Sequence, residues 1–202
     1  MCGIVGYTGK SDALSPVLEG LRRLEYRGYD SAGIALSTKP GTKLWIVKRA
    51  GKLGNLEGIL GDTVPDSHSG IGHTRWATHG GPTDTNAHPH VDNDGKLALI
   101  HNGIIENYVE LRAELEKRGH TFTSETDTES VVHLLSDARK KQNGDLAAAM
   151  RDVCKELRGS FTLLAIHSDD PERIVGARRN SPLVVGVGDG ENFLASDVAA
   201  FI

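Results

Sequence analysis

The sequence predicts an α+β fold, a layered sandwich in which helices cover antiparallel β-sheets. Nine short runs are rich in β-branched and apolar residues, and four longer segments place apolar residues at helical spacing. The strands occur in groups instead of alternating one by one with helices, which favours antiparallel pairing. Nine strands imply more than one sheet. Because each helix has a single apolar stripe, we expect the helices on the outer faces of the sheets.

The predicted strands are short apolar runs bounded by turn-forming or charged residues. The stretch Gly-Val-Gly-Asp-Gly at residues 186–190 is interpreted as a turn and not as a dinucleotide-binding loop, because no helical pattern follows it. The strands are predicted at residues 3–7, 32–37, 44–48, 71–74, 97–101, 160–167, 173–177, 183–187 and 192–196.

Each of the four predicted helices has a recognisable start or stop. The first begins at Ser15-Pro16, read as an N-cap followed by a first-turn proline, and the second runs from residue 108 to Gly119. The third follows Thr-Asp-Thr-Glu at residues 126–129, a capping-box pattern. The fourth places an apolar stripe over residues 146–157, and Cys154 on that stripe is expected to pack in the core.

Composition restricts the classes of function. The 202 residues fit one domain, residues 1–202, and the net charge of −4 leaves no basic excess for binding nucleic acid. Neither a cationic leader nor an apolar run of about 20 residues is present, which argues against export and membrane insertion. Two cysteines without CxxC spacing indicate neither a disulfide framework nor a metal site, so a reducing, cytoplasmic setting is expected.

Cys2 is the first candidate catalytic residue. Removal of Met1 would place a thiol and a free α-amine on one residue. The ordinary pKa of a cysteine is about 8.5 and that of an α-amine about 7.7, so the amine can accept the thiol proton close to neutral pH. The alternative is that Cys2 is only a small apolar residue at the start of a buried strand.

Four polar segments lie at the ends of predicted elements and carry a family resemblance. They are Tyr-Arg-Gly-Tyr-Asp-Ser-Ala-Gly at 26–33, Thr-Arg-Trp-Ala-Thr-His-Gly-Gly-Pro at 74–82, His-Asn-Gly-Ile-Ile-Glu-Asn at 101–107 and Ser-Glu-Thr-Asp-Thr-Glu at 124–129. Together with the opening Met-Cys-Gly-Ile, they closely resemble the glutaminase domain of class II glutamine amidotransferases. The sequences of the first two segments, including Tyr29 and Trp76, resemble the amino-sugar-forming branch of this class and differ from the phosphoribosyl branch.

This resemblance implies a fold and a reaction. The fold is the N-terminal-nucleophile hydrolase sandwich, a four-layer αββα arrangement with two antiparallel sheets. The reaction is hydrolysis of L-glutamine to L-glutamate and ammonia through a thioester on Cys2, with no cofactor. The ammonia would serve a C-terminal sugar isomerase domain that converts fructose 6-phosphate to glucosamine 6-phosphate in a full-length enzyme, expected to be a homo-oligomer. The present chain ends at Ile202, and we expect it to be an excised glutaminase domain.

The resemblance also implies which residues bind the substrate, because the family's binding residues match particular positions of this sequence. Glutamine has an α-carboxylate and an α-ammonium, so its site needs one fixed cation and one fixed anion. Arg75 is the expected cation, because guanidinium binds carboxylate through two parallel hydrogen bonds, and Thr78 and His79 resemble the residues that complete this clamp. Asp127 is the expected anion, with the Gly103 carbonyl as a second acceptor. The alternative role for Asp127 is a helix N-cap.

Three further segments have both a functional and a plain structural interpretation. The Asn102 side chain and the Gly103 N–H match the family's oxyanion hole, whereas an isolated Asn-Gly pair is typical of a type I′ hairpin turn. Trp76 and His88 resemble residues that line a mobile glutamine loop, in which Gly80-Gly81-Pro82 would act as a hinge. The proline within His88-Pro89-His90 and the absence of a further ligand at suitable spacing disfavour a metal site.

Two other functions stay open from the sequence. The same fold could serve a different acceptor domain, as in the phosphoribosyl branch, against which the spelling at Tyr29 and Trp76 argues. A non-catalytic module that binds glutamine or a partner would result if Met1 is retained, because an amine within a peptide bond is not basic.

Overall fold

The structure is a computed structural model that describes residues 2–28, 30–61, 64–77 and 79–202. Two antiparallel sheets form its centre. The larger has six strands in the order β3-β2-β4-β1-β10-β9, and the smaller has four in the order β5-β6-β7-β8. The strands are β1 (Gly3–Gly9), β2 (Ser31–Ser37), β3 (Trp45–Ala50), β4 (Ser69–Arg75), β5 (His90–Val91), β6 (Leu97–Ile105), β7 (Gly159–His167), β8 (Asp170–Arg179), β9 (Val184–Val187) and β10 (Glu191–Ala195).

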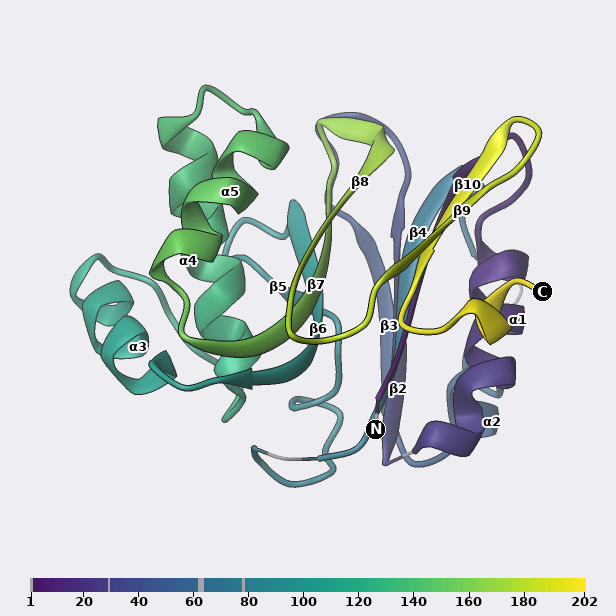
Figure 1. The fold of residues 1–202 in the computed structure, drawn as a ribbon, viewed down its shortest axis with the longest axis horizontal. Coiled ribbons are helices and arrows are strands. Elements are labelled where there is room, and N and C mark those ends of the chain that lie inside the picture. The colour runs from purple at the N-terminus through teal and green to yellow at the C-terminus, as the bar shows by residue number, and fades with distance from the viewer. Residues whose placement is uncertain (1, 29, 62–63, 78) are drawn as a thin grey trace.

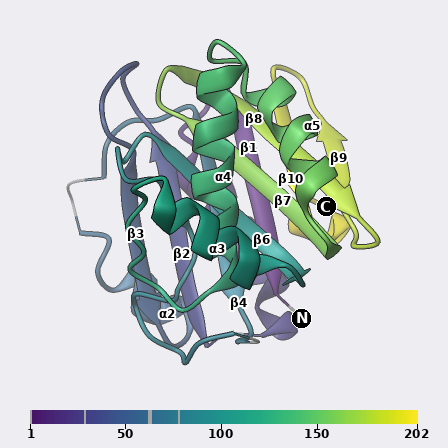
Figure 2. The same ribbon diagram turned by 90° about the vertical axis from the view of Figure 1, so that its left-hand side faces the viewer.

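Helices cover the outer face of each sheet, which gives four layers (Figure 1). Two helices pack on the six-stranded sheet. On the other side, two helices pack on the four-stranded sheet and a third packs beside one of them, as the turned view also shows (Figure 2). The helices are α1 (Leu14–Leu24), α2 (Leu53–Glu57), α3 (Tyr108–Lys117), α4 (Asp127–Lys141) and α5 (Leu146–Glu156). The expected α+β sandwich with two antiparallel sheets and outer helices is therefore confirmed.

Three buried apolar clusters separate these layers. One lies beneath α3, α4 and α5 and includes Val132 and Phe161, and a second lies beneath α1 and includes Leu21 and Tyr7. The third fills the space between the sheets and contains Ile4, Ile71, Ala98, Ile100, Leu164 and Ile166. Since successive strand residues point to opposite faces, Cys2 shares the inner face with Ile4, and Asn102 shares it with Ile100. Polar side chains at these ends therefore meet where the inner apolar layer stops.

The structure corrects several details of the predicted elements. Helix α1 begins at Leu14 with Ala13 at its N-cap and no side-chain capping bond, so the Ser15 cap is wrong. Ala13 is fully buried and donates its N–H to the Ser67 carbonyl, so tertiary contacts set this helix start. The two-residue strand β5 and the five-residue helix α2 were not predicted. The turn predicted at 186–190 is confirmed for residues 188–190, which connect β9 to β10 and in which Gly188 N donates to Glu191 O, whereas residues 186 and 187 still belong to β9.

Helix α4 starts without the predicted capping box. Thr126 is its N-cap residue, but the side chain makes no capping bond. The Glu129 carboxylate accepts hydrogen bonds from the backbone N–H groups of Thr123 and Ser124, at 2.8 and 2.6 Å, instead of from Thr126. The segment leading into α4 is thus fixed by Glu129 in the first turn of the helix. None of the helices in the described part of the chain combines the length and hydropathy that a membrane span requires.

Candidate active site

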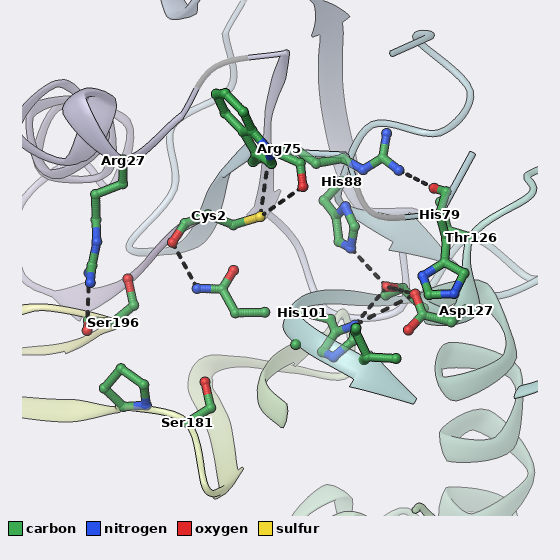
Figure 3. A pocket seen from close by; sticks show the side chains of 16 residues that line it. Cys2, Arg27, Arg75, His79, His88, His101, Thr126, Asp127, Ser181 and Ser196 are labelled. Carbon is green, nitrogen blue, oxygen red and sulfur yellow. Dashed lines mark hydrogen bonds and ion pairs between the residues drawn. The ribbon is translucent and has the colours of Figure 1, made fainter. Parts of the chain in front are cut away.

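A cavity of about 400 Å³ lies where several predicted elements end, and it is lined by seven of the eight predicted site residues. Antiparallel pairing of β1 with β4, in the register Gly3 with Thr74, places Cys2 beside the end of β4. Strand β6 brings its residues to the same cavity from the other sheet, and α4 begins at its wall (Figure 3). The seven are Cys2, Arg75, Trp76, His79, Asn102, Gly103 and Asp127; the eighth, Thr78, lies outside the described residues.

The Cys2 thiol is held against the backbone of Trp76. Its Sγ accepts a hydrogen bond from Trp76 N at 3.1 Å and lies 3.5 Å from Trp76 O. Burial raises the pKa of the Cys2 thiol, and the Trp76 N–H partly offsets that rise. The thiol is therefore the favoured form, and a nucleophilic role requires a base next to it.

Asn102 and Gly103 lie within β6, where they pair with Thr162 and Phe161 of β7. The alternative of a two-residue hairpin turn is therefore wrong. Asn102 Nδ2 donates to the Cys2 carbonyl oxygen at 3.0 Å, which places an amide donor directly at the candidate nucleophile. Donors fixed at this position are suited to stabilise an oxyanion formed on a carbonyl attacked by Cys2.

Gly103 occupies a position that only glycine fits. Its φ is +120°, a conformation that L-residues with side chains rarely adopt. A Cβ at this residue would lie 2.0 Å from the Ser160 carbonyl oxygen in the neighbouring strand. The glycine therefore lets β6 pass close to β7 while its backbone borders the cavity.

Arg75 is almost fully buried, and its guanidinium points toward the chain that follows β4 (Figure 3). The NH1 group donates to Gly81 O at 3.2 Å, and NH2 donates to His79 O and to Gly80 O, the latter at 3.3 Å. These carbonyls belong to residues 76–89, which we call the β4–β5 connection. Both terminal nitrogens thus have acceptors, and the predicted binding of a carboxylate by Arg75 requires an exchange of these bonds.

The other predicted residues of this connection differ in exposure. The Trp76 indole is 59% exposed, although its backbone contacts Cys2. The His79 ring is partly buried and packs edge-on against Tyr108, with 5.2 Å between ring centroids. His88 lies at the far end of the connection and is buried in the cavity wall.

Asp127 is the first residue of α4 and not its N-cap, so the capping alternative is wrong. Its Oδ2 accepts a hydrogen bond from Ile105 N at 2.8 Å, which ties the helix start to the end of β6. The carboxylate is 4% exposed and lines the cavity opposite the end of β4. Arg75 and Asp127 thus place one cation and one anion on the same cavity.

Three buried histidines lie close together beside the cavity, and two of them, His88 and His101, line it. His88 Nε2 and His101 Nδ1 both hydrogen-bond to Thr128 Oγ1, at 2.9 and 3.0 Å, and His90 Nε2 bonds to Thr126 Oγ1 at 2.9 Å. Burial lowers the pKa of each of the three rings, which favours their neutral forms. In the described parts of the chain, no group of three or more His, Cys, Asp or Glu side chains is arranged to hold a metal ion.

Sequence reasoning assigned no role to two residues that hold the site together. Asp30 accepts hydrogen bonds from Ala77 N and from Ser31 Oγ, the latter at 3.0 Å, and so fixes the start of the β4–β5 connection. His73, within β4, contacts the Asn102 side chain across the gap between the sheets. A polar residue at an inward-facing position of a buried strand was the available signal for His73.

Comparison with known proteins identifies the family of this chain. Residues 73–202 match the family model described as a glutamine amidotransferase domain. The whole chain is 64% identical to a glutamine–fructose-6-phosphate aminotransferase (isomerizing) from Streptomyces coelicolor and 58% identical to the enzyme of that name from Thermus thermophilus. It covers 32% of each, so the chain spans about a third of the length of these relatives.

Solved structures share the fold. The glutamine phosphoribosylpyrophosphate amidotransferase from B. subtilis, in complex with ADP and GMP, superimposes with a TM-score of 0.80 at 29% identity, over 99% of this chain and 43% of that chain. A structure described as the allosteric regulatory enzyme of purine biosynthesis gives a TM-score of 0.82 at 28% identity, with the same coverage. The higher identities to the aminotransferases confirm the predicted resemblance to the amino-sugar-forming branch. The chain therefore belongs to the glutamine amidotransferase family and has its N-terminal-nucleophile sandwich fold.

Proposed function

We propose that this domain hydrolyses L-glutamine to L-glutamate and ammonia, with Cys2 as the nucleophile. One observation carries the proposal: a terminal thiol, an amide donor, a cation and an anion line the same cavity. The carboxylate of glutamine would bind Arg75 with Thr78 and His79, and its ammonium would bind Asp127 and the Gly103 carbonyl. The side-chain amide would then reach Cys2.

The reaction begins once Met1 has been removed and the Cys2 α-amine is free. The amine accepts the thiol proton, and the thiolate sulfur bonds to the amide carbon of glutamine, whose C=O electrons move onto oxygen. Asn102 Nδ2 and Gly103 N would donate to that oxyanion. Its collapse breaks the C–N bond, the ammonium proton passes to the leaving nitrogen, and ammonia departs from a γ-glutamyl thioester. Water then attacks the thioester, which releases glutamate and restores the thiol.

We further propose that the ammonia serves a second domain. The relatives are about three times as long as this chain, and their names specify fructose 6-phosphate as a substrate. A C-terminal isomerase domain would aminate fructose 6-phosphate to glucosamine 6-phosphate in a full-length homo-oligomer. The exposed Trp76, next to Cys2, is a suitable contact for such a domain. A reactive Cys2 needs reducing conditions, which supports a cytoplasmic setting.

The test uses chain that intact-mass measurement shows to begin at Cys2. Glutamate, ammonia and glucosamine 6-phosphate are followed together after addition of glutamine, with and without fructose 6-phosphate. We expect equal amounts of glutamate and ammonia, no amino sugar and no change of rate with the sugar phosphate. Material that retains Met1 should bind glutamine without hydrolysing it, because its Cys2 nitrogen is not basic.

Each contrary result rejects a different part of the proposal. Processed chain that releases no glutamate would reject the hydrolytic function and favour the non-catalytic binding module. Formation of amino sugar, or stimulation by fructose 6-phosphate, would show that these 202 residues carry more than the glutamine half.

A further inference from the structure

His73 is the buried residue of β4 that connects the two sheets at the active site. Its side chain is fully buried, and Nε2 lies 3.0 Å from the His101 carbonyl oxygen and 3.0 Å from Asn102 Oδ1. The carbonyl oxygen can only accept a hydrogen bond, so Nε2 carries the proton. The same N–H is therefore available to the Asn102 side-chain oxygen.

This contact determines which way the Asn102 amide faces. An asparagine amide can turn by about 180° and exchange its oxygen with its nitrogen. With Oδ1 on the His73 N–H, Nδ2 faces Cys2, where it donates to the carbonyl oxygen at 3.0 Å. The turned amide would place Oδ1 against two other acceptors, the Cys2 carbonyl and the developing oxyanion, and would set Nδ2 against the His73 N–H.

The His73 ring is itself held in place. It stacks on the His88 ring with 4.2 Å between centroids, and His88 is bound to Thr128 of α4. Burial lowers the pKa of His73 to about 3, so the ring stays neutral and keeps a single N–H at neutral pH. Its Nδ1 is buried without a hydrogen-bond partner among the described residues, so Nε2 makes the ring's directional contacts.

We propose that His73 is a positioning residue for the reaction, which acts by fixing the Asn102 amide with its N–H groups toward the Cys2 nucleophile. This inference rests on the proposed glutamine hydrolysis, because it assigns His73 a role in stabilising that reaction's oxyanion. His73 touches neither substrate nor nucleophile in this role; its effect passes through Asn102.

The first test compares substitutions of His73 that differ in whether a donor reaches Asn102. His73→Leu removes the donor and should lower kcat about ten- to a hundredfold, with KM for glutamine changed less than about threefold. His73→Gln can place an amide N–H near the former Nε2 position and should restore much of kcat. His73→Asn is too short to do so and should behave like His73→Leu. If His73→Leu does not fold, the comparison of His73→Gln with His73→Asn gives the same test.

A second measurement separates positioning from general damage to the site. Alkylation of Cys2 by iodoacetamide displaces iodide from a saturated carbon and forms no oxyanion, so His73→Leu should leave its rate within about twofold of wild type. The double variant His73→Leu/Asn102→Ala should be no slower than Asn102→Ala alone, because both substitutions remove the same interaction. His167→Leu replaces another buried histidine, at the far end of β7, and should leave kcat unchanged.

The outcomes distinguish this inference from the proposed function. Wild-type chain that begins at Cys2 and releases no glutamate would reject the hydrolysis and, with it, this role of His73. If the wild type is active, any of three results would overturn the positioning role alone. These are an unchanged kcat in His73→Leu, alkylation of Cys2 in His73→Leu that slows as much as kcat does, and additive losses in the double variant.

Discussion

Cys2, Asn102 and Gly103 sit on or beside paired strands, whereas Trp76, His79 and the contacts of Arg75 belong to the β4–β5 connection. In the first region, the β1–β4 and β6–β7 ladders fix the backbone. In the second region, backbone carbonyls of the connection accept the hydrogen bonds that the Arg75 guanidinium donates. Groups on paired strands are already placed for the chemical step, but groups on the connection must exchange internal bonds for substrate. We therefore expect the strand region to control kcat and the connection to control KM.

The largest expected effect is a loss of activity on substitution of Cys2, in the strand region. Cys2→Ala removes the proposed nucleophile and should lower glutamate release by roughly 10⁴- to 10⁶-fold. Cys154→Ala is the matched control, because that thiol is half-buried against the core beneath α5 and outside the cavity. A glutamine-like electrophile followed by peptide mapping should label Cys2 alone, and label on Cys154 would reject the assignment.

Gly103 tests how strictly the strand ladder fixes the site. Gly103→Ala combines an unfavourable φ with a Cβ placed 2.0 Å from Ser160 O. Gly119→Ala is a control with φ +94° and open space around the added Cβ. We expect Gly119→Ala to lower the free energy of unfolding by about 1–2 kcal/mol and Gly103→Ala to lower it by a further ~2 kcal/mol or more, measured by urea denaturation. Equal losses would show that the close approach of β6 to β7 does not constrain the site.

The buried histidines His73, His88, His90 and His101 lie between the two regions. We expect acid to destabilise the fold there, because protonation of these rings is unfavourable in the folded state. Burial lowers the pKa values of His73, His88, His90 and His101 below their ordinary 6.5. Below about pH 6.5 the unfolded chain therefore binds more protons than the folded chain. The stability that these neutral rings contribute is complete above that pH and is lost as the pH falls; for His73 the loss continues down to about pH 3. Each histidine contributes up to about 1.4 kcal/mol per pH unit in that window.

Urea titrations between about pH 5 and 8 would measure this dependence. The unfolding free energy should be nearly constant above about pH 7 and fall below about pH 6. His88→Gln should reduce the slope, and His68→Gln should not, because His68 is exposed in the folded protein. A slope unaffected by His88→Gln would mean that the acid sensitivity arises elsewhere.

The two regions also differ in how far sequence could predict them. Apolar runs predicted the strands β1 and β6, because burial of one face leaves a periodic pattern, but the second run was predicted to end at His101 and β6 continues through Asn102 to Ile105. The contacts of Asp30 with Ala77 and of His73 with Asn102 join residues 47 and 29 positions apart, and no local pattern specifies such pairs. Glu129 illustrates the same limit, because its local spacing fits a capping box, whereas its carboxylate accepts hydrogen bonds from Thr123 N and Ser124 N of the preceding segment.

The smallest expected effects belong to the two charged residues that are predicted to bind the ends of glutamine. Arg75→Lys keeps the charge but loses the planar fork, and Asp127→Asn keeps an oxygen for Ile105 N while leaving the ammonium poorly paired. Each should raise KM about tenfold and change kcat less than about threefold.

Arg49→Lys is the control for this pair, because Arg49 also contacts the β4–β5 connection, at Asp84, but is half-exposed and outside the cavity. Its KM should stay near wild type, since a surface ion pair contributes at most about 1 kcal/mol. A folded Arg75→Lys or Asp127→Asn with unchanged kcat/KM would remove that residue from the glutamine site. If kcat fell instead of KM rising in Arg75→Lys, the separation between a region that controls rate and one that controls affinity would be wrong, because Arg75, which the β4–β5 connection holds, would then act on the transition state as directly as Asn102 does.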